Sequence, residues 1–297
     1  MAIVTYSLPS FAININDWDG ALSQLSSSHY QITDGYHQTD VYGSFSYNAS
    51  GVTGGTVTGM YWTQGNSPVL SMSGLNFDFL DALNASSTKL EQLAFKGNDT
   101  FNGTFFNDGF YGHTGNDTFN GGEGRDTVFY DGNKASIGVS ANGAGFKVNT
   151  LGKVDTLNSI ERIDMGDGSV LALDVKAGEN AGSAYRIYQA AFDRKPDATG
   201  LNYWVKQMDG GASLAEVAMG FVNSNEFKAA NPTNDPTTLI NSYYQHVLHR
   251  APDPTGAQYW SNAMATGMQA SDVLASFSES TENLANTAAA LKDGVWM

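Results

Sequence analysis

The chain has 297 residues, of which 33 are glycine, 7 are proline and none is cysteine. It carries 30 Asp and Glu against 15 Lys and Arg, and this formal net charge of −15 repels phosphate backbones and anionic lipid surfaces. We therefore expect no nucleic-acid partner and no direct membrane insertion. The absence of cysteine excludes disulfides and thiolate metal sites. With 41% hydrophobic residues, the chain is long enough for two or three globular domains.

The first region, residues 1–93, is rich in Ser, Thr, Gly and Tyr. Its alternation of apolar and polar residues predicts strands, and two stretches with helical spacing interrupt them. We expect a β-rich α+β module here. The predicted strands lie at residues 41–47, 56–63 and 69–73, and the predicted helices at residues 18–25 and 77–83.

A nine-residue repeat opens the second region, residues 94–177. Four aspartates follow one another at intervals of nine residues, and the last copy, Gly121 to Phe129, fits the pattern G-G-x-G-x-D-x-U-x, where U is a large apolar residue. Two units make one coil, so the first unit should stack on the third and the second on the fourth. The four aspartates are Asp99, Asp108, Asp117 and Asp126.

The repeat has the chemistry of a calcium site. Its glycines permit left-handed turns that bring carbonyl oxygens inward, and each aspartate adds a hard anionic oxygen. From Asp99 to Asp131 there are six acids and one base, so stacked carboxylates need a cation between them. Ca²⁺ fits oxygen ligands without thiol or imidazole. The candidate metal residues are Gly97, Asp99, Asp108, Gly115, Asp117, Gly122, Gly124 and Asp126.

These nonapeptides resemble those of the RTX family, bacterial proteins that carry glycine-rich calcium-binding β-rolls. The resemblance implies export by a type I secretion exporter that reads an uncleaved C-terminal signal. It also implies a short parallel β-roll, which the further strands expected at residues 147–150 and 170–175 would follow. The protein would then be secreted, and would work outside the cell or on its surface.

A second repeat, with an offset of 56 residues, fills the third region, residues 184–297. Tyr188-Gln189, Arg194 and Pro196-Asp197 recur as Tyr244-Gln245, Arg250 and Pro252-Asp253, and Tyr203-Trp204 as Tyr259-Trp260. Each copy predicts a helix, a turn and a second helix that Asp197 or Asp253 caps, with a hinge before the region at residues 180–183.

The duplicated unit resembles a domain of uncharacterised function found at the C-termini of type I secreted RTX proteins. It is also loosely similar to the helical domain of RTX surface-layer proteins, and this likeness suggests contacts with lipopolysaccharide. The Tyr and Trp side chains could stack on sugars or could lie in the core of the bundle.

No catalytic pattern stands out, because none of the five histidines lies beside a recognisable nucleophile or metal partner in the sequence. We expect a protein that is not an enzyme, although a secreted hydrolase stays open as a lesser alternative. A haem-binding carrier is a further alternative, since His29, Tyr30 and His37 in the first region could hold haem.

The sequence thus predicts an α+β multidomain protein with a β-rich N-terminal module, a short RTX parallel β-roll with following strands, and a C-terminal all-α bundle. We expect a calcium-stabilised structural or adhesive protein at the cell surface or in the extracellular matrix. Its partners would be a surface polysaccharide or other copies of itself.

Overall fold

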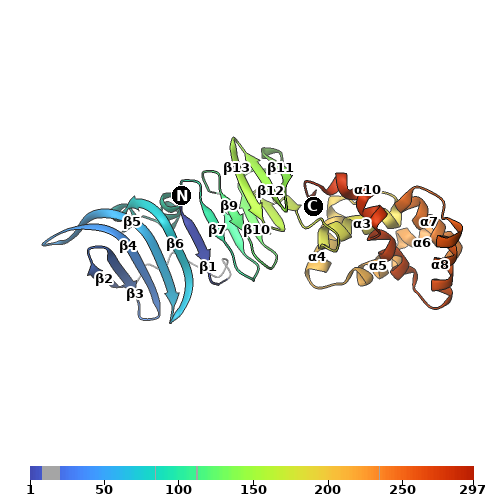
Figure 1. The fold of residues 1–297 in the computed structure, drawn as a ribbon, viewed down its shortest axis with the longest axis horizontal. Helices are drawn as coiled ribbons and strands as arrows, with labels where there is room; N and C mark the ends of the chain where they lie inside the picture. Colours follow the sequence, from blue (N-terminus) through green and yellow to red (C-terminus); the bar gives the residue numbers. More distant parts are fainter. Residues whose placement is uncertain (9–20, 84, 112, 234) are drawn as a thin grey trace. The chain divides into compact units, whose positions relative to one another are not determined.

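The computed structural model describes residues 1–8, 21–83, 85–111, 113–233 and 235–297 (Figure 1). The chain divides into two compact units, residues 1–169 and residues 170–297. The first unit is built mainly of strands and the second mainly of helices, which confirms the α+β class. Each unit is described by itself below.

A long antiparallel sheet occupies the first part of unit 1. Its strands pair in the spatial order β1-β6-β5-β4-β3-β2. The strands are β1 (Ile3–Tyr6), β2 (Ala21–Ser26), β3 (His29–Thr33), β4 (His37–Asn48), β5 (Gly51–Gln64) and β6 (Ser67–Asp78). One face of the sheet is apolar, and α1 (Phe79–Leu83) and α2 (Ser87–Ala94) pack against its strands. Tyr30, Phe45 and Phe79 form an aromatic cluster there, with ring centroids 4.8–5.0 Å apart.

The nonapeptides form a short two-sided roll that continues this sheet. On one side, β1, β7, β9 and β13 pair in parallel, and on the other β8, β10 and β14 pair in parallel. The strands are β7 (Thr100–Asn102), β8 (Gly109–Tyr111), β9 (Thr118–Asn120), β10 (Thr127–Tyr130), β13 (Lys153–Asn158) and β14 (Arg162–Met165). The U positions point inward: Phe101, Phe119 and Val128 are at most 2% exposed.

An antiparallel hairpin interrupts the roll after the fourth nonapeptide. The short helix η2 (Lys134–Ser136) leads into β11 (Ile137–Asn142), which pairs with β12 (Gly145–Thr150), and β12 pairs with β13. The chain then rejoins the roll, because β13 lies parallel to β9 and β14 lies parallel to β10. The roll therefore has one more coil than the four nonapeptides provide.

Several expectations need correction. Three regions were predicted, but β1 pairs with both β6 and β7, so residues 1–93 and the roll share one sheet within one unit (Figure 1). The helix predicted at residues 18–25 is a strand from Ala21 onward, since it pairs with β3, and residues 18–20 lie outside the described residues. The strand predicted at residues 170–175 ends at Ala172.

Unit 2 is a bundle of helices in which one set of four is repeated. The helices are α3 (Asn180–Phe192), α4 (Ala198–Asp209), α5 (Leu214–Asn223), α6 (Asn225–Ala230), α7 (Pro236–Leu248), α8 (Pro254–Ala265), α9 (Ala270–Ser278) and α10 (Thr281–Leu291). As predicted, Asp197 and Asp253 cap α4 and α8: they accept hydrogen bonds from the Gly200 and Gly256 amides at 2.8 and 2.9 Å. A short pairing of β15 (Val170–Ala172) with β16 (Val295–Trp296) joins the two ends of this unit.

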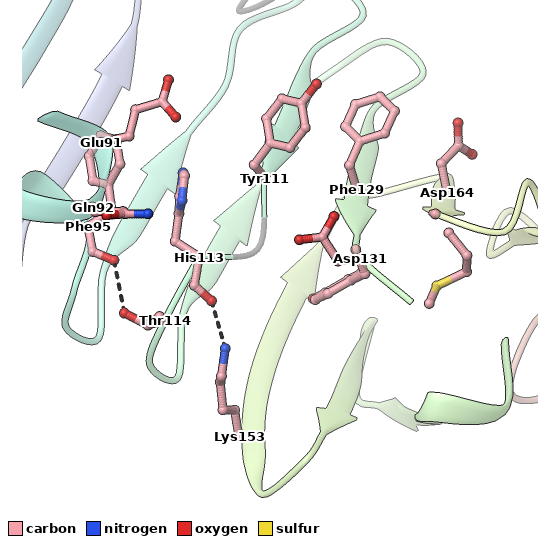
Figure 2. A pocket seen from close by; sticks show the side chains of 13 residues that line it. Glu91, Gln92, Phe95, Tyr111, His113, Thr114, Phe129, Asp131, Lys153 and Asp164 are labelled. Carbon is pink, nitrogen blue, oxygen red and sulfur yellow. Dashed lines mark hydrogen bonds between the residues drawn. The ribbon is translucent and has the colours of Figure 1, made fainter. Parts of the chain in front are cut away.

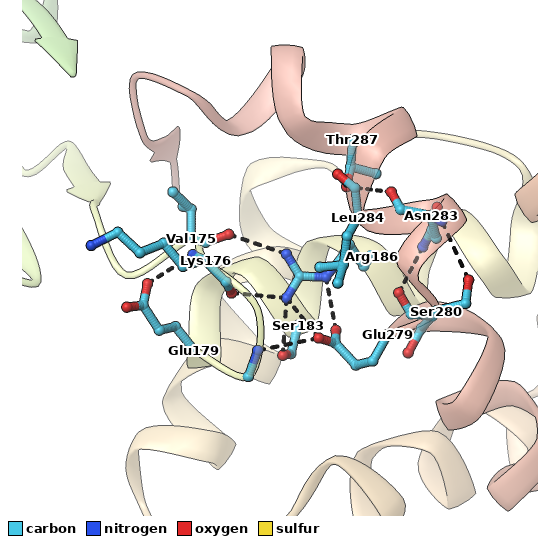
Figure 3. A network of polar contacts seen from close by, with 12 residues as sticks. Val175, Lys176, Glu179, Ser183, Arg186, Glu279, Ser280, Asn283, Leu284 and Thr287 are labelled. Atoms are coloured by element: carbon cyan, nitrogen blue, oxygen red, sulfur yellow. Dashed lines mark hydrogen bonds and ion pairs between the residues drawn. The ribbon is translucent and has the colours of Figure 1, made fainter. Parts of the chain in front are cut away.

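The hinge predicted at residues 180–183 is instead the first turn of α3, and a buried arginine anchors it (Figure 3). Arg186 is 1% exposed and donates from Nε and Nη2 to the Glu279 carboxylate at 2.8 and 2.9 Å. It also donates to the carbonyls of Val175 and Lys176 at 3.1 and 3.0 Å. A buried guanidinium must satisfy its donors. These bonds therefore hold the segment before α3, at Val175 and Lys176, against α3 and Glu279.

The Tyr-Trp pairs divide between core and surface. Trp204 stacks on Phe221 with centroids 4.9 Å apart, and Trp260 lies 5.1 Å from Phe277, so both indoles pack against the core. The preceding tyrosines point outward, since Tyr203 is 55% exposed and Tyr259 is 61% exposed. The sequence allowed either location for these aromatic side chains. In each pair the tryptophan packs against the core and the tyrosine lies at the surface.

Candidate metal centre

Two ladders of aspartates run along the turns of the roll. On one side, the Asp99 amide donates to Asp117 Oδ1 at 2.8 Å, and the Asp117 amide donates to Asp155 Oδ1 at 2.8 Å. On the other side, the Asp108 amide donates to Asp126 Oδ1 at 2.7 Å and the Asp126 amide to Glu161 Oε2 at 2.8 Å. Each carboxylate therefore ties its turn to the turn before it.

Asp155 and Glu161 extend these ladders, and the sequence reasoning missed both. The signal for Asp155 was present, because the stretch from Asp155 to Asn158 (Asp-Thr-Leu-Asn) repeats the Asp-Thr-Phe-Asn of residues 99–102 and 117–120. The inserted β11–β12 hairpin hid it by breaking the nine-residue spacing. Asparagines at the end of each strand form a matching ladder: Asn120 Nδ2 donates to Asn102 Oδ1 at 2.8 Å, and Asn158 Nδ2 donates to Asn120 Oδ1 at 2.8 Å.

The predicted glycines are needed for close stacking of the turns. Gly115, Gly122 and Gly124 have φ values of 118°, 105° and 108°, a region that L side chains avoid. A Cβ on Gly115 would also collide with the carbonyl oxygen of Gly97. Gly97 itself has no positive φ, and its carbonyl group lies against Gly115 in the neighbouring turn.

The carboxylates of these turns have the features of cation ligands. Asp99, Asp117 and Asp126 are at most 3% exposed, and the Oδ2 atom of each has no hydrogen-bond partner. Burial raises the pKa of Asp117 to about 7, with the nearby Asp155 and Asp99 carboxylates adding to the shift. Burial likewise raises the pKa of Asp126 to about 7, with Glu161 and Asp108 adding to it. An unpaired buried carboxylate is costly, so a cation at these oxygens would stabilise the fold.

Backbone oxygens must complete any such site. The described residues hold no group of three or more His, Cys, Asp or Glu side chains arranged around a metal position. Calcium, which takes six to eight oxygen ligands and accepts backbone carbonyls, suits such turns. Asp99 and Asp117 on one side and Asp126 on the other are the side chains that would hold it. Bound there, calcium would supply the charge that the stacked carboxylates lack.

Asp108 differs from the other three aspartates. Its Oδ2 accepts hydrogen bonds from the backbone amide and the hydroxyl of Thr104, at 2.7 and 2.8 Å. Thr104 stands where the pattern has a glycine, and its side chain supplies a partner that a cation would otherwise give. A cation between Asp108 and Asp126 would therefore gain less from the Asp108 carboxylate than from the Asp126 carboxylate.

Lys153 places a positively charged side chain beside the ladder formed by Asp99, Asp117 and Asp155. Its Nζ donates to the carbonyl oxygen of His113 at 2.9 Å, within the turn that leads to Asp117. The ammonium lowers the pKa of both Asp117 and Asp155, against the larger effect of burial. The second oxygen of Asp155 accepts the Tyr130 hydroxyl at 2.9 Å. The last coil therefore has charge and hydrogen-bond partners from the chain itself.

Comparison with known families agrees with this geometry. The model of the RTX calcium-binding nonapeptide repeat (4 copies) matches residues 94–128. The chain carries RTX repeats. Repeats of this kind bind calcium and are typical of secreted proteins. A domain of unknown function, DUF4214, matches twice, at residues 178–231 and 232–287, which agrees with the predicted duplication. No curated protein matches the chain.

The side chains behind the haem alternative already have partners in the N-terminal sheet. His29 Nε2 lies 2.7 Å from Asp40 Oδ1, and its ring stacks on Tyr42 at 4.6 Å. Tyr30 is 3% exposed within the aromatic cluster, and His37 Nδ1 lies 2.8 Å from Asp34 Oδ2. No observation favours this alternative over the RTX repeats.

Among the described residues, we find no helix long and apolar enough to span a bilayer.

Proposed function

We propose that this chain is an extracellular structural or adhesive protein, stabilised by calcium and exported by a type I system, that acts by binding surface glycan and carries out no catalysis. The RTX repeats support the calcium and the route. Calcium outside cells reaches the range in which extracellular calcium modules are filled, so the roll would complete its folding after export.

The observation that carries the adhesive role is the pair of exposed tyrosines in the duplicated module. Tyr203 and Tyr259 occupy equivalent places in the two copies, and each stands nearly perpendicular to its own tryptophan, with interplanar angles of 78° and 79°. Two equivalent, rigidly supported aromatic contacts on one unit favour bivalent attachment to a repeating polymer.

The test is adhesion to surface polysaccharide, measured in calcium for the wild type, for Tyr203→Ala, for Tyr259→Ala and for the double variant. We expect each single variant to bind the polysaccharide more weakly than the wild type. The double variant should lose roughly 10-fold or more in affinity, because linked sites gain avidity only when both contacts are present. Tyr36→Ala is the matched control, because Tyr36 is 58% exposed in the other unit.

Light scattering of the same samples separates glycan binding from self-assembly. If the wild type forms large particles in calcium without polysaccharide, and the tyrosine variants do not, the tyrosines serve self-association. A double variant that adheres as well as the wild type would overturn the role given to the tyrosines.

A further inference from the structure

A groove of about 810 Å³ lies within unit 1, between α2 and the outer face of strands β8, β10 and β14 (Figure 2). This volume is in the range of pockets that hold small organic ligands. None of the proposed calcium ligands lines it. The groove therefore offers a second binding site, separate from the stacked aspartates.

On the side formed by the sheet, the groove is lined by a row of three side chains from neighbouring strands, Tyr111, Phe129 and Asp164. The parallel register places Phe129 beside Tyr111 on one side and beside Asp164 on the other. The rings of Tyr111 and Phe129 stack, with centroids 5.1 Å apart and planes 25° from parallel. Tyr111 is 63% exposed, so this row presents an aromatic surface that ends in a carboxylate (Figure 2).

The charge of the groove is negative. Glu91, Asp131 and Asp164 line it, and within the described residues none of these three carboxylates forms a hydrogen bond or an ion pair. Burial raises the pKa of Glu91, and burial also raises that of Asp164, although Arg162 and Arg125 act on Asp164 in the opposite direction. The one lysine in the lining, Lys153, already donates to a carbonyl.

Glu91 and Asp164 are partly buried and Asp131 is exposed. A partly buried carboxylate without a hydrogen bond or ion pair gains free energy when a cation reaches it, and aromatic faces also attract cations. A neutral ligand would use the aromatic row and leave the carboxylates unpaired. An anionic ligand would be repelled by them, and by the net charge of −15 on the chain. The groove is therefore built for a ligand that combines a positive charge with a flat apolar surface.

We infer that this groove binds a saccharide with free amino groups: its ammonium groups would pair with Asp131, Asp164 and Glu91, and a sugar ring would lie on Tyr111. The inference rests on the proposed glycan-binding function and names the class of glycan. The Gln92 amide, also in the lining, can bond saccharide hydroxyl groups at the α2 side, and the experiment separates a saccharide from a basic peptide.

Isothermal titration calorimetry of the full chain in calcium tests the inference. The probes are a glucosamine tetramer, the N-acetylglucosamine tetramer, a galacturonate tetramer and tetralysine. We expect the glucosamine tetramer to bind at least 10-fold more tightly than each of the others, and more weakly as salt rises. Tyr111→Ala and Asp164→Asn should each weaken its binding at least 5-fold.

Tyr36→Ala and Asp81→Asn are the controls, since both residues are exposed in the same unit outside the groove, and they should bind like the wild type. Circular dichroism checks that every variant keeps the wild-type spectrum. The inference is overturned if the acetylated tetramer or tetralysine binds as tightly as the glucosamine tetramer, or if the groove variants bind normally. Should adhesion depend on Tyr203 and Tyr259 while the wild type ignores glucosamine, the inference fails and the proposed function stands.

Discussion

The Lys153 ammonium donates to the His113 carbonyl at 2.9 Å, and it does so beside the carboxylates of Asp117 and Asp155. A chain cation thus occupies the end of the aspartate ladder that lies beyond the nonapeptides. At Asp99 and Asp117 the Oδ2 atoms have no hydrogen-bond partner, whereas at Asp155 the Tyr130 hydroxyl supplies the remaining hydrogen bond.

Removing this ammonium should destabilise the roll. We expect Lys153→Gln to lower the free energy of unfolding at pH 7.5 by about 1.5 to 3 kcal/mol, the usual worth of a hydrogen bond to a charged group. The loss should shrink at pH 5, where Asp117 is protonated in the calcium-free protein. Thermal melts in chelator at both pH values measure this. Lys147→Gln, at an exposed lysine of β12, is the control, and equal melting of both variants would contradict the role of Lys153.

The aspartates should differ in their contribution to calcium binding. Asp117→Ala should weaken calcium binding more than Asp108→Ala, because Asp117 Oδ2 has no partner while Asp108 Oδ2 is already held by Thr104. Calcium titration followed by calorimetry gives the two affinities. The assignment fails if Asp108→Ala has the larger effect, or if the wild type melts at the same temperature in chelator and in millimolar calcium.

Stability should depend on pH when calcium is absent. Burial raises the pKa of Asp117 and Asp126 from 3.8 to about 7 in the folded chain. Between these pH values the folded state holds more protons than the unfolded state, so the calcium-free protein should lose stability as the pH rises from 4 to 7. Melting in chelator at pH 5 and pH 7.5 checks the sign.

Calcium should remove this trend, because it replaces the protons at the same oxygens and binds more tightly at pH 7.5 than at pH 5. A calcium-free protein that is more stable at pH 7.5 than at pH 5 would show that these carboxylates are not the groups that dominate.

The two members of each Tyr-Trp pair should lose different amounts of stability on truncation. Trp204→Ala should cost about 3 kcal/mol of stability, the low end for a buried aromatic, because Trp204 is only partly buried against Phe221. Tyr203→Ala, at a side chain that is 55% exposed, should cost about 0.5 kcal/mol. Urea unfolding of both variants, and of the equivalent Trp260→Ala and Tyr259→Ala, measures the difference. If the tyrosine variant also costs about 3 kcal/mol, both residues of the pair belong to the core.

The sequence alone determined the features that depend on local spacing. Aspartates nine residues apart, with glycines at fixed offsets, led to the stacking of Asp99 with Asp117, since the coil length follows from the repeat. The 56-residue offset likewise showed the duplicated helical unit, and the Pro-Asp turn showed the caps at Asp197 and Asp253. Each of these signals comes from the order and spacing of residues along the chain, and within each repeat neighbouring residues decide the conformation.

Features that depend on residues far apart in the chain became visible in the folded structure. The pairing of β1 with β7 joins residues separated by about a hundred positions, and it merges the first two predicted regions into one sheet. The inserted hairpin hid Asp155 and Glu161, which rejoin the ladders 38 and 35 residues after their partners. The groove and the Lys153 bond arise in the same way, because strand pairing between residues far apart in the sequence brings these side chains together.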